Sequence, residues 1–182
     1  GAQPDPAPGA RATPIYQTTA YVFEDADHAA ALFNLQVFGN VYTRLMNPTT
    51  AVLEERVAAL EGGRAGLACA SGHAAQLLTF HTLMSPGDEI VSARQLYGGS
   101  INQFNQSFAK FDWRVKWADT THVDSFKPLI TDRTKAIYCE SIANPGGLIT
   151  DIEALAKIAH DAGVPLIVDN TLASPYLIRP IE

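Results

Sequence analysis

Residues 136–170 read AIYCESIANPGGLITDIEALAKIAHDAGVPLIVDN and contain the strand–helix–strand pattern on which the fold prediction rests. The apolar run at each end of this stretch predicts a buried strand. Between the two runs, the capping-box pattern of Thr150 and Glu153 predicts a helix over residues 151–162, and Gly163 ends it. A helix that connects two strands in this way makes them parallel strands of one sheet.

The alternation of apolar runs and helical patterns continues toward the N-terminus. The expected strands are 66–70, 89–93, 113–118, 136–140 and 165–169. The expected helices are a short one from about Asp25, then 52–60, 74–84, a segment opened by Tyr97, 122–130 and 151–162. This order predicts an α/β fold with three layers, α/β/α, and a mostly parallel sheet. We expect residues 1–49 to form an N-terminal arm and residues 50–182 to form the sheet domain.

The composition argues against several classes of protein. A formal net charge of −6 without a cluster of Lys and Arg argues against a nucleic-acid partner. No apolar run approaches the roughly 20 residues of a membrane helix, and the first residues lack the apolar region of a signal peptide. None of the five histidines lies in an HExxH motif or near a CxxC motif, so no metal site is predicted. Cys69 and Cys139 lie in apolar runs and are expected to be buried thiols, which favours the cytoplasm.

Polar residues follow the expected strands, where the ligand crevice of such a sheet lies. Ser71, Gly72 and His73 stand where a strand passes into a helix, and the N–H groups of a helix N-terminus bind anions. Asp169 follows the last apolar run. Its carboxylate suits a ring nitrogen that must stay protonated, as pyridoxal 5′-phosphate (PLP) requires. Tyr97, with two glycines after it, could lay its ring flat on such a cofactor.

Each of these residues also has a simpler interpretation. A strand–glycine–helix connection is common in α/β proteins, Asp169 could cap a turn or a helix, and Tyr97 could pack as an ordinary loop aromatic. Tyr42 and Arg44 together offer a phosphate hydrogen bonds and positive charge, but Arg44 could equally be a solvated surface residue. Only the combination of these residues points to one kind of protein.

Five motifs supply that combination. They are YTR (42–44), ASGHAA (70–75), YGGS (97–100), ESIANP (140–145) and VDNTLASPY (168–176). In this order they resemble the Cys/Met-metabolism family of PLP-dependent enzymes, and the resemblance runs from about Pro14 to the end of the chain. It implies PLP as the cofactor. It also implies an incomplete large domain of the fold that aspartate aminotransferase has.

The resemblance implies roles for particular residues. The residues expected to bind the cofactor are Tyr42, Arg44, Ser71, Gly72, His73, Tyr97, Asn144, Asp169 and Thr171. The backbone of the ASGHAA motif would hold the phosphate, Tyr97 would stack on the pyridine ring, and Asp169 would bind the ring nitrogen. Asn144 would donate to the ring hydroxyl, and Thr171 would lie against the ring. His73 departs from the methionine or glutamine often found there, which leaves its backbone N–H unaffected.

The resemblance implies an oligomer as well. Tyr42 and Arg44 would reach the phosphate of a neighbouring subunit, so a homo-oligomer is expected, a dimer often paired into a tetramer. Tyr97, and Tyr42 from the neighbour, are the expected catalytic residues, because a phenol can assist proton transfer.

Residues 38–63 resemble the members that replace the acetate of O-acetyl-L-homoserine with sulfide, giving L-homocysteine. An amino-acid substrate and sulfide are therefore the expected partners. Methionine γ-lyase and cystathionine γ-synthase or lyase share the same cofactor contacts and stay open as alternatives. The family's Schiff-base lysine is expected beyond Glu182, and none of the chain's five lysines is expected at the crevice. The chain alone is thus expected to be inactive. As a non-enzyme alternative, it is an inert half of an assembly with a companion fragment.

Overall fold

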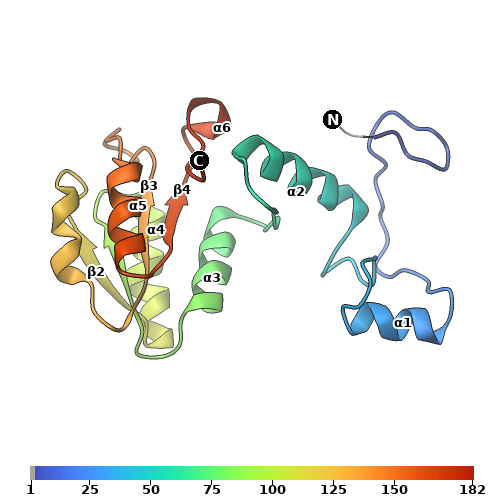
Figure 1. Ribbon diagram of the computed structural model, residues 1–182, viewed down its shortest axis with the longest axis horizontal. Coiled ribbons are helices and arrows are strands. Elements are labelled where there is room, and N and C mark those ends of the chain that lie inside the picture. The colour runs from blue at the N-terminus through green and yellow to red at the C-terminus, as the bar shows by residue number, and fades with distance from the viewer. Residues whose placement is uncertain (1–2) are drawn as a thin grey trace. The chain divides into compact units, whose positions relative to one another are not determined.

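A computed structural model describes residues 3–182, so Gly1 and Ala2, the first residues of the predicted arm, lie outside the described residues. The chain divides into two compact units, Gly1–Ala68 and Cys69–Glu182 (Figure 1). Over residues 3–182, every helix is too short or too polar to cross a membrane. The predicted boundary between residues 49 and 50 stays a prediction.

The first unit is an extended arm followed by two helices, α1 (Ala26–Phe33) and α2 (Pro48–Glu61). Helix α1 begins after Asp25, whose carboxylate accepts the His28 N–H at 2.7 Å. Helix α2 ends at Gly62, which adopts the left-handed conformation (φ 72°) that glycine reaches without steric cost.

Asn47 joins the arm to the start of α2. Its Oδ1 accepts the Thr49 N–H at 2.9 Å and so caps the helix, while its Nδ2 donates to the Tyr16 carbonyl at 3.0 Å. The Thr49 hydroxyl donates to the Pro14 carbonyl at 2.8 Å. These polar contacts order an arm that has little apolar core. Large apolar side chains of α2 are exposed in this unit, with Leu53 at 56%.

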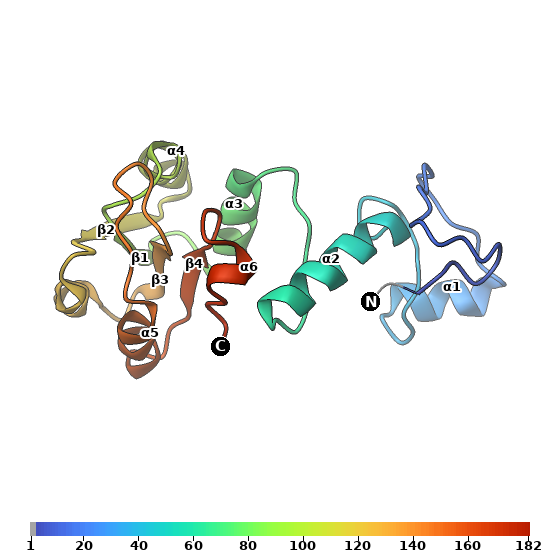
Figure 2. The same cartoon turned by 90° about the horizontal axis from the view of Figure 1, so that it is seen from above.

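The second unit is built on a parallel sheet with the strand order β2-β1-β3-β4. Its strands are β1 (Glu89–Ala93), β2 (Arg114–Ala118), β3 (Thr134–Glu140) and β4 (Leu166–Asp169). Its α-helices are α3 (Gly72–Leu83), α4 (Gly98–Asn102), α5 (Ile152–Asp161) and α6 (Ser174–Leu177). Figure 2 shows α3 and α4 on one side of the sheet and α5 on the other. The predicted α/β fold with three layers and a parallel sheet is confirmed.

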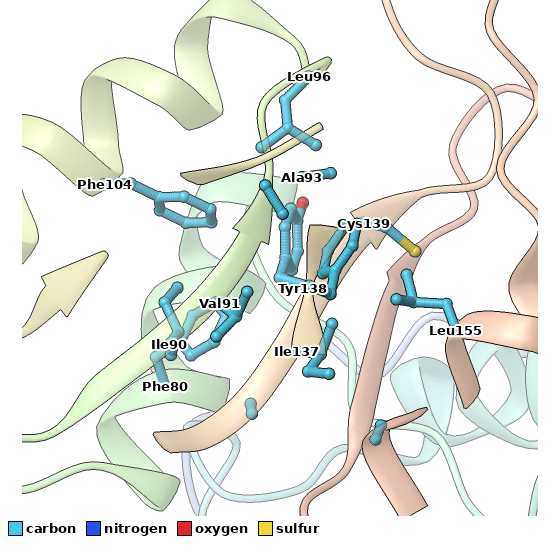
Figure 3. Close-up of a cluster of buried hydrophobic side chains, with 14 of the residues drawn as sticks. Phe80, Ile90, Val91, Ala93, Leu96, Phe104, Ile137, Tyr138, Cys139 and Leu155 are labelled. Atoms are coloured by element: carbon cyan, nitrogen blue, oxygen red, sulfur yellow. The ribbon is translucent and has the colours of Figure 1, made fainter. Parts of the chain in front are cut away.

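The core lies against both faces of β3. Because side chains alternate along a strand, Tyr138 faces α3 and α4 while Cys139 points toward Leu155 of α5 (Figure 3). Phe80 is fully buried, and the centroid of its ring lies 5.2 Å from the centroid of the Phe108 ring. Burial raises the pKa of the Cys139 thiol to about 12, so this cysteine is an inert buried thiol, as predicted. Cys69 is unbridged but only partly buried.

Three local predictions were wrong. The apolar run 66–70 is not a strand: it pairs with none of the four strands, and Leu67 is 75% exposed. A strand needs a neighbouring ladder of hydrogen bonds, which apolar character alone does not provide. The predicted helix 122–130 is replaced by two short 3₁₀-helices, η3 (Val123–Ser125) and η4 (Lys127–Leu129). Pro128 cannot donate an N–H to a continuous helix there.

The third correction concerns the start of α5. Thr150 does not cap this helix, because its hydroxyl donates to the buried Glu140 carbonyl at 2.6 Å. Asp151 caps it instead and accepts the Ala154 N–H at 3.0 Å. Sequence spacing identified the helix and missed the cap by one residue, because a tertiary contact competed for the threonine.

Candidate functional site

A cleft with a volume of about 340 Å³ lies at the carboxyl edge of the sheet. Its lining residues are Ser71, Gly72, His73, Gln76, Tyr97, Ser100, Glu140, Ile142, Asn144, Asp169, Thr171 and Leu172. They come from the ends of β3 and β4, the segment after β1 and the start of α3. A volume of this size suits a small organic ligand.

The structure brings seven of the nine predicted cofactor-binding residues to this cleft. They are Ser71, Gly72, His73, Tyr97, Asn144, Asp169 and Thr171. The other two, Tyr42 and Arg44, belong to the first unit, where the Arg44 guanidinium lies 4.7 Å from the centre of the Tyr42 ring. The structure groups the seven residues, and their individual roles stay predictions.

The N-terminus of α3 offers two backbone donors to the cleft. Ser71 caps the helix, since its Oγ accepts the Ala74 N–H at 3.1 Å. Within residues 3–182, no acceptor is found for the N–H groups of Gly72 and His73. A side chain at Gly72 would meet nothing within 4 Å, so the backbone there is open to a ligand. Two free N–H groups at the positive end of a helix suit a phosphate.

Asp169 is the last residue of β4, and hydrogen-bond donors surround its carboxylate. Oδ1 accepts the Thr171 N–H at 3.0 Å and the Thr171 hydroxyl at 2.5 Å. Oδ2 lies 3.3 Å from the Tyr138 hydroxyl and 3.5 Å from Gln76 Nε2. The bonds to Oδ2 are long, so this oxygen can accept a further donor from the cleft.

The rings of Tyr97 and His73 stack in the cleft, with centroids 6.0 Å apart and an angle of 25° between the planes. Gly99 leaves room for both rings. A Cβ there would overlap Cε1 of Tyr97 and lie 2.8 Å from Cε1 of His73. The sequence indicated Tyr97 but not its stacking on the His73 side chain.

Glu140 is a cleft residue for which no role was predicted from the sequence. Its carboxylate is buried and accepts two backbone N–H groups, that of Tyr97 at 2.7 Å and that of Asn144 at 3.1 Å. Burial raises the pKa of Glu140, although both donors act in the opposite direction. Through these two hydrogen bonds, Glu140 joins the segment after β1 to the segment after β3. Its position directly after an apolar run was a signal that could have identified it.

The cleft residues given above include no lysine, although the five lysines of the sequence all lie in the described part of the chain. Four of them form ion pairs with carboxylates. These pairs are Lys116–Glu89, Lys127–Asp124, Lys135–Asp88 and Lys157–Asp161. This agrees with the expectation that none of the five lysines stands at the crevice.

Comparison with known proteins identifies the family. Residues 1–182 match the family described as Cys/Met metabolism PLP-dependent enzyme. The chain belongs to this family. The expected membership and PLP as the family cofactor are therefore confirmed.

Relatives in the Cys/Met metabolism family include well-matched sequences and structures. The chain is 50% identical to O-acetyl-L-homoserine sulfhydrylase of Leptospira meyeri, over all of this chain and 41% of the relative. It is 41% identical to L-methionine gamma-lyase of Fusobacterium nucleatum, over 96% of this chain and 44% of the relative. The chain thus spans less than half the length of these relatives.

A solved structure of the Cys/Met metabolism family agrees with the fold. It is described as an O-acetylhomoserine (thiol)-lyase from Campylobacter jejuni and carries N′-pyridoxyl-lysine-5′-monophosphate. The TM-score is 0.90 at 43% identity, over 92% of this chain and 41% of that one.

The cleft of this chain fits the family cofactor by its own chemistry. PLP has a phosphate, a ring nitrogen that must hold a proton, and a flat aromatic face. The cleft offers the two free N–H groups of α3, the Asp169 carboxylate and the Tyr97 ring. Each of these three groups of PLP therefore finds a matching group among the lining residues.

Proposed function

We propose that the complete protein containing this chain converts O-acetyl-L-homoserine and sulfide to L-homocysteine and acetate. In this reaction the bond from the γ-carbon to the acetate oxygen breaks, and a bond from the γ-carbon to sulfur forms. Sulfide loses a proton, and acetate carries away the electron pair of the broken bond. The observation that carries the proposal is the 50% identity to an O-acetyl-L-homoserine sulfhydrylase along the whole chain.

We assign the cofactor contacts to particular residues. Gly72 and His73 would bind the phosphate through their N–H groups, beside the Ser71 hydroxyl. Asp169 would accept a hydrogen bond from the protonated ring nitrogen. PLP would supply electron withdrawal through its protonated ring, which makes the bonds of a bound amino acid easier to break.

The remaining residues complete the arrangement. Tyr97 would stack on the ring, and Asn144 would donate to the ring hydroxyl. Thr171, which donates twice to Asp169 Oδ1, would hold that carboxylate in place and lie against the ring. The hydroxyls of Tyr97, and of Tyr42 from a neighbouring subunit, would move protons during exchange at the γ-carbon.

The proposal is tested by turnover of the complete purified protein. We expect homocysteine from O-acetyl-L-homoserine and sulfide, at a kcat/KM at least about tenfold above that for methionine or cystathionine cleavage. Faster release of methanethiol from methionine would favour methionine γ-lyase, which the identity to the Fusobacterium nucleatum enzyme supports as the second candidate. Preferred reaction with cysteine or cystathionine would favour the cystathionine enzymes. Failure of all three assays with a PLP-loaded protein would favour the inert assembly.

Gly99→Ala is expected to weaken PLP binding about tenfold without unfolding the protein. The new methyl group must displace the rings of Tyr97 and His73, and Tyr97 is 50% exposed, so its ring can move at little cost in stability. Titration of the apoenzyme with PLP measures the affinity, and thermal unfolding measures the stability. The control is Gly98→Ala in the same helix, where a Cβ meets nothing within 4 Å. Equal PLP affinity of both variants would contradict the role of Tyr97.

We further propose that residues 1–49 act on the cleft of a neighbouring subunit, in a homo-oligomer located in the cytoplasm. Tyr42 and Arg44 would contact the phosphate there. Two inactive variants test this, Arg44→Ala and Asp169→Asn. In a dimer with one subunit of each variant, one cleft carries both substitutions and the other carries neither. After equal mixing about half of the dimers are of this kind, so roughly a quarter of the clefts, and of the activity, is expected to be restored. The absence of any recovery, with subunit exchange verified by mass, would show that both residues serve the same subunit.

A further inference from the structure

A buried glutamine stands behind the carboxylate that we assign to the cofactor ring. Gln76, one turn into α3, is 9% exposed. Its Nε2 lies 2.9 Å from Ser100 Oγ and 2.7 Å from the Tyr138 hydroxyl. The same nitrogen lies 3.5 Å from Asp169 Oδ2. One side-chain amide thus connects α3 to α4, β3 and β4.

The donors of this network form a chain that ends at Asp169. The amide nitrogen of Gln76 carries two protons, and its two short contacts are with Ser100 and Tyr138. The Tyr138 oxygen therefore accepts from Gln76, which leaves its own proton for Asp169 Oδ2 at 3.3 Å. Burial, and then the negative charge of Asp169, raise the pKa of Tyr138, so its hydroxyl stays a donor.

The oxygen of the Gln76 amide indicates why Nε2, and not Oε1, is the atom on the side of Asp169. Gln76 Oε1 is buried and has no hydrogen-bond partner in the part of the chain that the structure describes. Turning the amide over would direct Oε1 at the Asp169 carboxylate, where two acceptors would face each other. An unpaired buried acceptor is uncommon in folded proteins, and here it accompanies a donor that faces the cleft.

We propose that Gln76 is a positioning residue: through Tyr138 it fixes Asp169 Oδ2 toward the ring nitrogen of the bound cofactor. The inference rests on the proposed function, in which Asp169 binds that nitrogen. Thr171 holds Oδ1 from one side, and the chain from Gln76 through Tyr138 holds Oδ2 from the other. Asp169 then cannot rotate away when the cofactor binds.

The test compares variants of the complete holoenzyme: Gln76→Met, Tyr138→Phe, and each of them combined with Asp169→Asn. Methionine keeps the length of glutamine and removes both donors. We expect Gln76→Met to raise the Kd for PLP about tenfold and to change how the absorption spectrum of bound PLP depends on pH. Tyr138→Phe is expected to have an effect of similar size. Neither substitution should weaken binding further in the Asp169→Asn protein, because all three act through one carboxylate.

The matched control is Gln95→Met. Gln95 Nε2 also donates to an aspartate after a strand, Asp119 Oδ1 at 2.9 Å, but neither residue lines the cleft. This variant should keep the Kd and the spectrum of the unsubstituted protein. If the glutamine donors served only the fold, Gln76→Met and Gln95→Met would both lower the stability. Thermal unfolding measures that effect separately from PLP binding.

Two results separate the failure of this inference from failure of the proposed function. If Asp169→Asn weakens PLP binding but Gln76→Met does not, or if their effects add in full, the positioning role of Gln76 is wrong and the site assignment stands. If the unsubstituted protein does not bind PLP, or Asp169→Asn leaves the Kd unchanged, the site assignment fails and the inference falls with it. Should Gln76→Met not fold, Tyr138→Phe decides, because it removes a single oxygen atom.

Discussion

The Asp169→Asn variant of the complete protein is expected to turn over its amino-acid substrate at least about 100-fold more slowly than the unsubstituted protein. Asparagine has the same size but carries no charge to hold a proton on the ring nitrogen. Its NH₂ group would also face donors at either position. Thr171 donates twice to Oδ1, and Oδ2 faces Tyr138 and Gln76. Steady-state kinetics and the amount of PLP retained after dialysis measure the effect.

The control for this prediction is Asp119→Asn. Asp119 follows β2 as Asp169 ends β4, and it likewise accepts the N–H and hydroxyl of a threonine two residues on, Thr121. It lies outside the cleft, so its variant should keep kcat and PLP retention. Near-normal turnover of Asp169→Asn, or an equal loss of turnover in Asp169→Asn and Asp119→Asn, would contradict the assignment of Asp169 to the cofactor ring.

Phe80→Ala is expected to lower the free energy of unfolding by about 3–5 kcal/mol, the usual cost of deleting a fully buried phenylalanine. The Phe80 side chain is 0% exposed and packs against three other rings. The distances between ring centroids are 5.6 Å to Phe104, 5.2 Å to Phe108 and 5.9 Å to Tyr138. Phe80 belongs to α3, and its ring packs against β3 and against the segment of Phe104 and Phe108, so the cavity cannot close without moving one of these elements. Urea unfolding of the complete protein measures the loss.

The comparison variant is Phe111→Ala, because Phe111 is 40% exposed and deleting its ring leaves a site open to solvent. It should cost less than half as much as Phe80→Ala. The Phe80 substitution should also weaken PLP binding, since the ring it removes supports Tyr138, which donates to Asp169. Equal stability of the two variants would mean that Phe80 is not at the centre of the core.

Several elements could be predicted from local patterns. The strand 89–93 and the helix that starts near residue 72 appear where apolar spacing and glycine positions indicated them. The run 66–70 shows the limit of that approach, because its apolar residues find no neighbouring strand in the described sheet. Thr150 shows another limit: its sequence context suits a helix cap, but the Glu140 carbonyl takes its hydroxyl. Hydrogen bonds between segments distant in sequence leave no local pattern.

Sequence alone was enough to predict the family, the parallel sheet and the residues near the carboxyl ends of strands, including Asp169 and Tyr97. Alternation along β-strands and the rule that their carboxyl ends share one edge are local or topological, so they can be read from one chain. Which buried groups support these residues could be seen in the fold alone. Gln76 and Tyr138 look in sequence like ordinary helix and strand residues. They act on the cleft because folding brings side chains 62 and 93 positions away to within hydrogen-bonding distance of Gln76.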